Sequence, residues 1–371
     1  MFLFVGNMSL IGEGGITVFR YDPNSGATEL LGTQHTDVSA GHICIDKPHS
    51  RLFCVNERLE CNGIPGGEAV CYRINSATGD LVLLSRTNTY TVLPCYVCYL
   101  ANSNRLMVCN HAKRDYALRL TSCADGLVRW EKVFDDAVLE VFDVQKDGSI
   151  SGPSTFWVAP SSADASDNPH LHSITYDEQN EQAYVCDTGG SRVYSVSCEK
   201  GRRLSLLQTV TPDIEDSSPR YGVLHPRLST FYFNSEKHNS LFVYTIANRR
   251  LIPLQRISVV QSESSSDARW MQSAVAINAA GTVLYALTRM TSSISVFNIL
   301  PDGRLLAAQT LQLLSVYPRS LAISPDGRFV FVVCSQGKSV IRIKISDDGR
   351  LFDQSIVADS LSSPSSMVFG G

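Results

Sequence analysis

Residues 320–352 read SLAISPDGRFVFVVCSQGKSVIRIKISDDGRLF and contain one complete copy of a repeating unit. The first half, residues 320–335, has two apolar, alternating segments around the turn signal Pro-Asp-Gly, which is typical of two strands joined by a tight turn. The second half, residues 339–352, has an alternating segment, a turn with Asp-Gly and a short segment that begins with Leu351. The unit therefore predicts four short strands.

The second half of this unit occurs seven times along the chain. The steps between its aromatic or aliphatic anchor residues are 53, 70, 52, 50, 53 and 46 residues. Short alternating strands that recur about every 50 residues are typical of the four-stranded blades of a β-propeller. The anchors are Phe19, Tyr72, Phe142, Tyr194, Tyr244, Phe297 and Ile343.

The first half occurs only six times, and its seventh copy is divided between the two ends of the chain. SSMVFGG (residues 365–371) supplies the first strand, and MFLFVGN (residues 1–7) supplies the second. A ring closed by pairing these strands leaves no unpaired sheet edge, which is how an all-β chain avoids edge-to-edge aggregation. We therefore predict an all-β fold in which residues 1–371 form one seven-bladed β-propeller with four-stranded antiparallel blades, closed by N- and C-terminal strands that share a blade.

The longest step, 70 residues, marks an insertion at residues 112–138. Polar stretches at residues 161–169 and 261–268 predict loops. Alternation and β-branched residues favour strands elsewhere, so we expect no long helix and no domain boundary.

The charge balance and the hydropathy pattern restrict the partners. The 371 residues carry a formal net charge of −4, without the basic footprint that binding to phosphate backbones requires. No segment approaches the roughly 20 apolar residues of a membrane-spanning helix, and the first residues lack the basic region of a secretory leader. We therefore expect neither nucleic acid nor a membrane as a partner.

The eleven cysteines are placed as small buried hydrophobic residues. Cys54, Cys186 and Cys334 each lie within an apolar run. Such placement is typical of a reducing compartment, and we expect the protein to be cytoplasmic.

Polar residues at the hairpin ends predict a site at one mouth of the central channel. The first and last residues of a hairpin lie at the same end of the ring, and the innermost strand of each blade lines the channel. His172 is thereby paired with Asp187, Arg220 with Glu236, Gln272 with Arg289, and Arg319 with Ser335.

Two arginines, a glutamate and a histidine at one mouth indicate a site for a small, anionic, carboxylate-bearing molecule. Arginine binds carboxylates through two hydrogen bonds and stabilises a developing oxyanion, while glutamate and histidine transfer protons. The alternative is that each is an ordinary turn residue bonded to backbone groups between blades. For any single residue this alternative stays open.

Several motifs carry a resemblance to a known family over essentially the whole chain. They are CVNE (54–57), LPCYV (93–97), NPHLHSITYD (168–177), CDTGGSRV (186–193), SPRYGVLHP (218–226), NSE (234–236), LYALTRMTSSISVF (284–297) and YPRSLAISPDGRFVFV (317–332). In their order and spacing the chain resembles the lactonase-type seven-bladed propellers. This family includes propeller-type 6-phosphogluconolactonases and the fungal 3-carboxy-cis,cis-muconate lactonizing enzyme.

The resemblance implies an enzyme that forms or hydrolyses a lactone without a cofactor or a metal. The histidine, two arginines and glutamate that the muconate enzyme is thought to place around its channel mouth fall on His172, Arg220, Glu236 and Arg289, which are the candidate catalytic residues. The candidate substrate-binding residues at the same mouth are Glu57, His170, Asp187, Gln272 and Arg319.

Three residues depart from the family pattern at the expected pocket wall. Tyr221 stands where the family often has histidine, and Thr288 and Met290 flank Arg289 in place of asparagine and glycine. The substrate, the choice between hydrolysis and cyclisation, and the oligomeric state therefore stay open.

Other chemistries are less favoured. His170 and His172 share a strand face, but a metal site needs a third ligand, for which His111 and Asp187 are the candidates. Cys95 and Cys98 resemble half a zinc or redox motif, although residues three apart on a strand face opposite sides. Neither a phosphate-binding loop nor a serine nucleophile elbow occurs in the sequence.

The alternative from another class is a non-catalytic propeller that binds a small acid or a protein partner. Three tryptophans in the whole chain offer little aromatic material for a large protein interface. Binding of small acids without turnover would distinguish this alternative from an enzyme.

Overall fold

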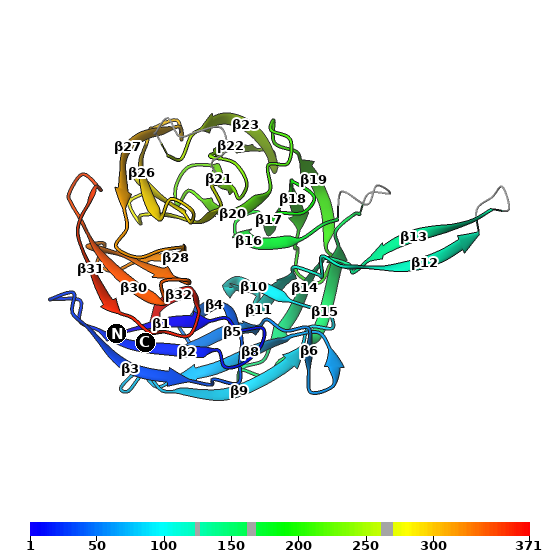
Figure 1. Cartoon of the computed structure of the whole chain (residues 1–371), viewed down its shortest axis with the longest axis horizontal. Helices are drawn as coiled ribbons and strands as arrows, with labels where there is room; N and C mark the ends of the chain where they lie inside the picture. Colours follow the sequence, from blue (N-terminus) through cyan, green and yellow to red (C-terminus); the bar gives the residue numbers. More distant parts are fainter. Residues whose placement is uncertain (123–126, 162–167, 261–269) are drawn as a thin grey trace.

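The computed structural model describes residues 1–122, 127–161, 168–260 and 270–371. Within these residues, seven four-stranded antiparallel sheets form a ring (Figure 1). The innermost strands contact one another in a closed circle. The predicted all-β, seven-bladed propeller is confirmed.

Each sheet is ordered from the innermost strand outward, and the first four along the chain begin with β4, β10, β16 and β20. They are β4 (Ala40–Asp46), β5 (Arg51–Asn56), β8 (Glu68–Ile74) and β9 (Leu81–Asn88); β10 (Pro94–Leu100), β11 (Arg105–Asn110), β14 (Val138–Val144) and β15 (Ile150–Val158); β16 (Leu171–Asp177), β17 (Gln182–Asp187), β18 (Arg192–Ser197) and β19 (Ser205–Val210); and β20 (Pro219–Leu224), β21 (Thr230–Ser235), β22 (Leu241–Ala247) and β23 (Arg250–Ile257).

The remaining three sheets follow the same plan. They are β24 (Gln272–Ile277), β25 (Val283–Thr288), β26 (Ser293–Ile299) and β27 (Leu305–Gln312); β28 (Pro318–Ile323), β29 (Phe329–Cys334), β30 (Ser339–Ile345) and β31 (Leu351–Ala358); and β32 (Pro364–Gly370), β1 (Phe2–Asn7), β2 (Gly15–Tyr21) and β3 (Thr28–Gln34).

The last of these sheets closes the ring as the divided repeat predicts. β32 pairs antiparallel with β1, so that Phe2 lies opposite Gly370 and Leu3 opposite Phe369. The two chain ends therefore lie side by side (Figure 1). Because residues of both ends enter one sheet, the closing blade has the same four-stranded plan as the others, with β32 innermost and β3 outermost.

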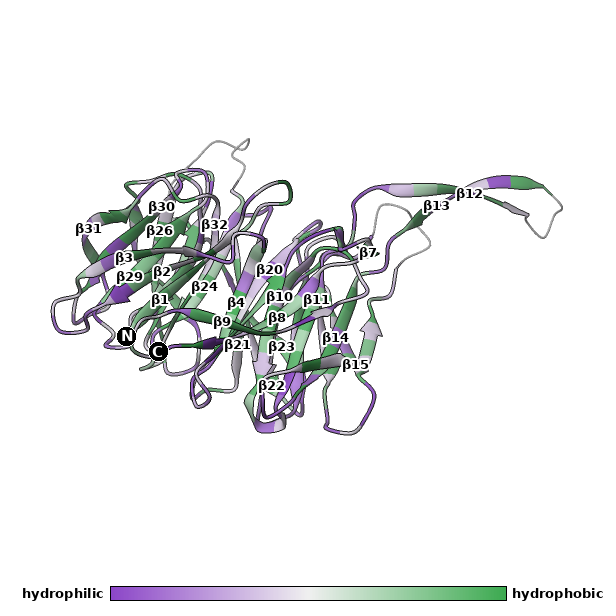
Figure 2. Ribbon diagram, turned by 90° about the horizontal axis from the view of Figure 1, so that it is seen from below, coloured by the Kyte–Doolittle hydropathy of each residue, from purple (hydrophilic) through white to green (hydrophobic). Residues whose placement is uncertain are grey.

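Three small elements interrupt the blades. A 3-10 turn, η1 (Ala101–Ser103), joins β10 to β11, and a short hairpin of β6 (Glu60–Cys61) and β7 (Ile64–Pro65) follows β5. The predicted insertion is a second hairpin, β12 (Tyr116–Ser122) and β13 (Val128–Phe134), which projects from the disc (Figure 2). The predicted loops at 161–169 and 261–268 lie largely or wholly outside the described residues.

Among the described residues, no helix is long and apolar enough to cross a membrane. Ten cysteines are described, all as free thiols, and all except Cys44 and Cys98 are buried.

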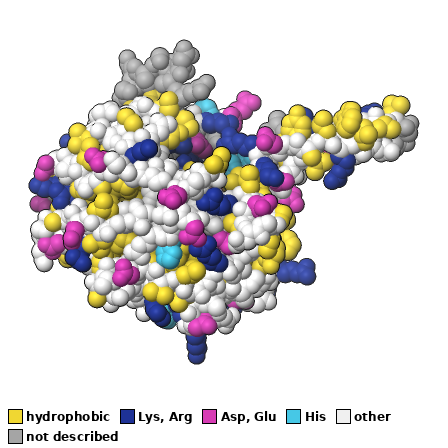
Figure 3. Space-filling model, turned by 60° about the horizontal axis from the view of Figure 1, so that its bottom comes forward, with side chains coloured by type: hydrophobic (Ala, Val, Ile, Leu, Met, Phe, Trp, Pro, Cys, Tyr) yellow, Lys and Arg dark blue, Asp and Glu magenta, His cyan; other side chains and the backbone are white. Residues whose placement is uncertain are grey.

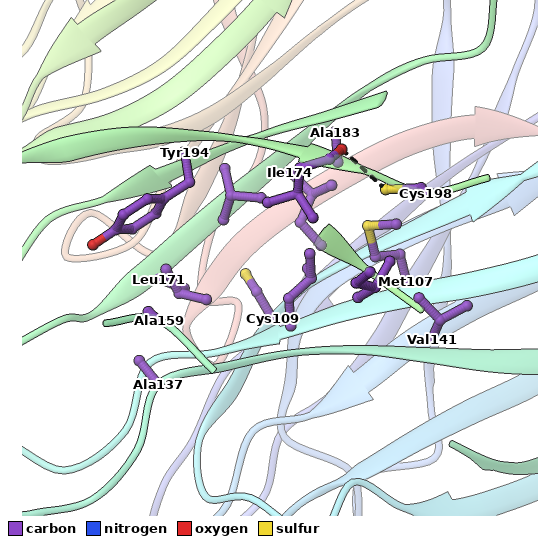
Figure 4. Close-up of a cluster of buried hydrophobic side chains, with 14 of the residues drawn as sticks. Met107, Cys109, Ala137, Val141, Ala159, Leu171, Ile174, Ala183, Tyr194 and Cys198 are labelled. Atoms are coloured by element: carbon purple, nitrogen blue, oxygen red, sulfur yellow. Dashed lines mark hydrogen bonds between the residues drawn. The ribbon is translucent and has the colours of Figure 1, made fainter. Parts of the chain in front are cut away.

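Apolar clusters between neighbouring sheets hold the blades together. One cluster joins the sheet of β10, β11, β14 and β15 to the sheet that begins with β16, with Met107, Cys109 and Val141 packed near Ile174 and Ala183 (Figure 4). These side chains come from alternate positions of their strands, because successive residues of a strand point to opposite faces. The packing fixes the innermost strands, whose ends carry the polar residues.

Candidate active site

Two positions of the repeat bring side chains to the same end of the ring. The entry position is the second residue of each innermost strand, and the exit position is the residue that follows the neighbouring strand. In all seven described blades, the exit residue donates its backbone N–H to the carbonyl that precedes the innermost strand, as Glu236 does to Ser218 over 2.8 Å. The entry residues are Gly41, Cys95, His172, Arg220, Ser273, Arg319 and Ser365, and the exit residues are Glu57, His111, Thr188, Glu236, Arg289, Ser335 and Met8.

A β-bulge turns the entry residues out of the strand pairing. Leu171 and Ser173 pair with consecutive residues of β17, so the register omits His172. The register omits Arg319 in the same way between β28 and β29, and it omits Arg220 with its neighbour between β20 and β21. A bulge re-aims a side chain that would otherwise follow the strand alternation.

Arg220, Glu236 and Arg289 form a buried charge cluster. Nη2 of Arg289 donates to Oε1 of Glu236, and Nε of Arg220 lies 3.7 Å from the same oxygen. Backbone carbonyls hold Arg289 in place, since its Nε donates to Met271 over 2.8 Å and its Nη2 to Gln272 over 3.1 Å. The side chains of Arg220 and Arg289 are only 2% and 5% exposed.

The charges within this cluster shift one another's protonation. Burial favours the neutral form of Glu236, but Arg220 and Arg289 outweigh it and hold the pKa of that carboxyl below its usual range. Burial, and then the charge of Arg289, lower the pKa of Arg220 to about 10. Glu236 and Arg220 are therefore charged at neutral pH, and the cluster joins two guanidinium groups to one carboxylate.

Arg220 also has unsatisfied hydrogen-bonding capacity. Among the described residues, its buried Nε and Nη1 have no hydrogen-bond partner. Its guanidinium lies 4.9 Å from the ring centre of Tyr221, which covers one face of the group. Because leaving buried donors unpaired is unfavourable, these nitrogens mark a place where an anion would gain strong hydrogen bonds.

His172 is a neutral imidazole beside this cluster. Burial, followed by the charge of Arg220, lowers its pKa well below the usual value. Its buried Nδ1 has no hydrogen-bond partner among the described residues. A neutral imidazole offers one donor and one acceptor, so His172 can meet a hydroxyl or a carbonyl of a bound molecule.

Glu57 is a second carboxyl, in a different electrostatic state. Burial raises its pKa to about 7, although the nearby charges of Arg319 and Arg220 act in the opposite direction. The group packs so closely on Gly41 that a Cβ added there would lie 2.1 Å from Oε2 of Glu57. Glu57 is therefore the carboxyl whose ionisation changes near neutral pH.

An aromatic wall adjoins the polar groups. The Tyr221 ring lies 5.5 Å from the His172 ring and 5.6 Å from the Tyr96 ring, and His42 stacks on Tyr96 at 3.7 Å between centroids. The sequence singled out only Tyr221 of these residues, as a departure from the family pattern. His42, Tyr96 and Tyr221 each follow an entry residue, and this shared position is the signal that could have identified the wall.

His111 is a site residue that the sequence indicated only as a possible metal ligand. Its ring stacks on His170 at 4.6 Å and lies 6.2 Å from the His172 ring. It occupies the exit position of its blade, as Glu57 and Glu236 do, so the repeat could have revealed it. Among the described residues, no three His, Cys, Asp or Glu side chains are arranged to hold a metal ion.

Three further candidates for substrate contact, His170, Asp187 and Gln272, make hydrogen bonds within the protein. Nδ1 of His170 lies 2.7 Å from the carbonyl oxygen of His111. Asp187 is fully buried and accepts the backbone N–H of His170 over 2.7 Å and the hydroxyl of Tyr194 over 3.0 Å. The Gln272 amide donates to a carbonyl, that of His238, over 2.9 Å. These contacts fit side chains that position their neighbours.

The chain is a closed seven-bladed β-propeller whose strand ends bring two buried arginines together with Glu236 and His172. Residues 2–369 match the family described as lactonase, 7-bladed β-propeller, and the chain belongs to this family.

Curated relatives of the chain carry the name 6-phosphogluconolactonase. The protein from Erwinia tasmaniensis is 25% identical over 178 residues, which are 48% of this chain and 53% of the relative. The protein from Enterobacter sp. strain 638 is 30% identical over 119 residues, 32% of this chain and 35% of the relative. The matches thus span about half or less of these relatives.

Solved structures show the same fold along the entire chain. The periplasmic gluconolactonase of Pseudomonas aeruginosa has a TM-score of 0.83 at 22% identity, with 100% of this chain and 99% of that chain covered. A putative 6-phosphogluconolactonase from Bacteroides uniformis has a TM-score of 0.80 at 18% identity, covering 99% and 98% of the two chains.

Proposed function

We propose that this protein is a cofactor-independent enzyme that acts on a small anionic lactone at the channel mouth, by hydrolysing its ring ester or, as the second candidate, by cyclising an unsaturated acid to the lactone. The observation that carries the proposal is the Arg220 guanidinium, which is buried, charged and in need of acceptors for two of its nitrogens. The family and the names of its relatives support the same reaction class.

The arginines would bind the anionic group of the substrate and the charge that develops on its carbonyl. Arg220 would do this through Nε and Nη1, with Arg289 held at its side by Glu236. Arg319 lies close enough to influence both Glu57 and His172 electrostatically. Fixed donors in a buried site stabilise a developing oxyanion more strongly than water does.

Glu57 is the group best suited to proton transfer. As a carboxylate it would take a proton from water while the water oxygen attacks the lactone carbonyl. Collapse of the tetrahedral intermediate breaks the ring C–O bond, and the proton passes from Glu57 to the leaving alkoxide, which gives the open hydroxy acid. A pKa of about 7 is near the optimum for a general base at neutral pH.

Glu236 would then orient the two arginines, since its lowered pKa makes it a weak base. His172, neutral at this pH, would hydrogen-bond the substrate through Nδ1. The sequence pattern assigned proton transfer to Glu236 and His172, and their surroundings agree better with supporting roles. The free, mostly buried thiols fit a reducing compartment, and we propose a cytoplasmic location.

The test measures hydrolysis of 6-phosphogluconolactone and gluconolactone, and cyclisation of 3-carboxy-cis,cis-muconate, each against the uncatalysed rate. Arg289→Ala should lower kcat/KM at least tenfold on whichever substrate is turned over. Arg304→Ala serves as the matched control, because Arg304 pairs with Asp302 on the surface. If the wild type binds these compounds without turning them over, the protein is non-catalytic. If Arg289→Ala and Arg304→Ala are equally active, the proposed site is refuted.

A further inference from the structure

The projecting hairpin is a rigidly rooted arm. β12 and β13 pair in continuous register from Tyr116 opposite Phe134 to Ser122 opposite Val128. At its root, Ala112 and Ala137 are buried in the cluster between two sheets. The arm therefore leaves the disc at a fixed place, directly after the exit residue of its blade.

One face of the arm is apolar and open. Because side chains alternate along a strand, every second residue of β12 and its partner on β13 point the same way. Five residues of this face are between 47% and 65% exposed, and Figure 3 shows hydrophobic side chains gathered along the arm. They are Tyr116, Leu118, Leu120, Val128 and Trp130.

Beyond the pair of Ala117 and Val133, the opposite face is polar. Arg119 lies opposite Glu131 and Thr121 opposite Arg129 in the strand register. Only one charged residue, Lys132, belongs to the apolar face, and its ammonium group lies 4.5 Å from the ring centre of Tyr116. This division into two faces is the pattern of a sheet that buries one side against another surface.

An isolated two-stranded hairpin is at best marginally stable in water, so an arm of this composition needs a cover. We propose that the cover is the arm of a second copy of this chain, with the two apolar faces packed against each other about a two-fold axis. A two-fold interface is self-complementary, so one apolar face suffices for both partners. Stacked sheets pack face to face at about 10 Å.

The available area fits a dimer. An aromatic side chain buries about 150–250 Å² when it is fully covered, so side chains of about this size that are 47–65% exposed can each bury on the order of 100 Å². The apolar face of one arm thus supplies on the order of 500 Å², and two arms supply on the order of 1,000 Å², where specific protein interfaces begin.

A lipid bilayer is a poorer partner for the arm. Within the described residues, β12 and β13 form a sheet of two strands only, so no further strand pairs with the outer edge of either one. Open sheet edges are strongly unfavourable in hydrocarbon, whereas in an arm-to-arm dimer they stay in contact with water. The net charge of −4 also opposes attraction to anionic lipids.

The experiment compares molar mass by light scattering and sedimentation velocity at about 1–100 µM protein for three full-length forms. The wild type should have twice the chain mass of 40.7 kDa. Leu120→Glu should shift the dimer dissociation constant at least a hundredfold towards monomer. Thr121→Glu adds the same charge to the same strand on the polar face, and it should remain a dimer.

Hydrogen exchange of the arm amides gives a second readout. Protection in the wild type should increase with protein concentration and should not do so in Leu120→Glu. A wild type that is monomeric throughout, or a dimer that Leu120→Glu leaves intact, would overturn the proposal. A monomer that floats with phosphatidylcholine vesicles through the arm would assign the apolar face to a bilayer instead.

Discussion

At the residue scale, the two carboxyls of the site differ because their surroundings differ. Glu236 faces two arginines, while burial dominates at Glu57 and raises its pKa to about 7. If the Glu57 carboxylate is the base, kcat/KM should rise with pH through about 7, because deprotonation creates the active form. In Glu57→Gln this rise should vanish and kcat/KM should fall by about 100-fold or more.

A pH-rate profile from 5 to 8, corrected for spontaneous hydrolysis, checks this. The control is Glu29→Gln, which removes an exposed carboxyl on β3 and should leave the profile unchanged. If kcat/KM of Glu57→Gln still rises with pH through about 7, another group is the general base. His172→Asn should retain the rise, since the pKa of that histidine lies well below this range.

Arg220 gives a second expectation at this scale, because a buried charge with unpaired nitrogens serves binding at the expense of stability. Removing one partner of a buried ion pair is costly when it leaves the other charge unpaired, whereas replacement that leaves no charge unpaired is often neutral or stabilising. In Arg220→Met, Glu236 keeps Arg289 as its partner. Arg220→Met should therefore leave the melting temperature unchanged or higher while kcat/KM falls about 100-fold or more. Thermal unfolding and kinetics on one preparation test this, and a large loss of stability would make Arg220 a structural residue.

The sequence indicated His172, Arg220, Glu236 and Arg289 from the hairpin ends and from the resemblance to the family, and the structure places them at entry and exit positions of neighbouring blades. The sequence did not indicate that the pKa values of Glu57 and Glu236 shift in opposite directions, since these shifts depend on burial and on which arginines lie nearest. It also did not separate Asp187, whose carboxylate is occupied by backbone and tyrosine donors, from the residue that follows it at the exit position.

At the element scale, the bulge at the start of each innermost strand determines where the site residues point. In β4 the pairing shifts between Ala40 and Ile43, and Gly41 lies in this bulge against Glu57. An added methyl group would meet Oε2 of Glu57 at 2.1 Å. Gly41→Ala should therefore displace the carboxyl and lower kcat at least tenfold, with a changed apparent pKa in the pH-rate profile.

Gly152→Ala is the matched control, because a Cβ on that glycine of β15 would meet nothing within 4 Å. Equal kinetics of the two variants would show that the bulge does not position Glu57. Sequence alternation predicted the strands but not these bulges. Leu93, Ser218 and Tyr317, each just before an innermost strand, adopt positive φ although none is glycine, so composition gives no local sign of the irregularity.

At the scale of the whole molecule, the number of blades and the closure were predictable because a divided repeat leaves one half-unit at each end. The orientation of the arm was not, since the 70-residue step shows only that an insertion exists. The closing sheet is also where the two ends of the chain depend on one another. Phe369 of β32 is 5% exposed, and its ring lies 5.2 Å from Tyr21 and 5.4 Å from Phe331.

Truncating Phe369 should therefore destabilise the fold and weaken the closing sheet first. Phe→Ala at a buried position costs about 3–5 kcal/mol, so Phe369→Ala should lower the free energy of unfolding by that amount. Phe352→Ala on β31, where the ring is 48% exposed, should cost less than about 1 kcal/mol. Chemical denaturation of both variants measures the difference.

Because the closure joins the first and last strands, hydrogen exchange in Phe369→Ala should rise in β1 and β32 before it rises in β16 or β20. Uniform exchange across the blades would show that the ring does not open at this sheet.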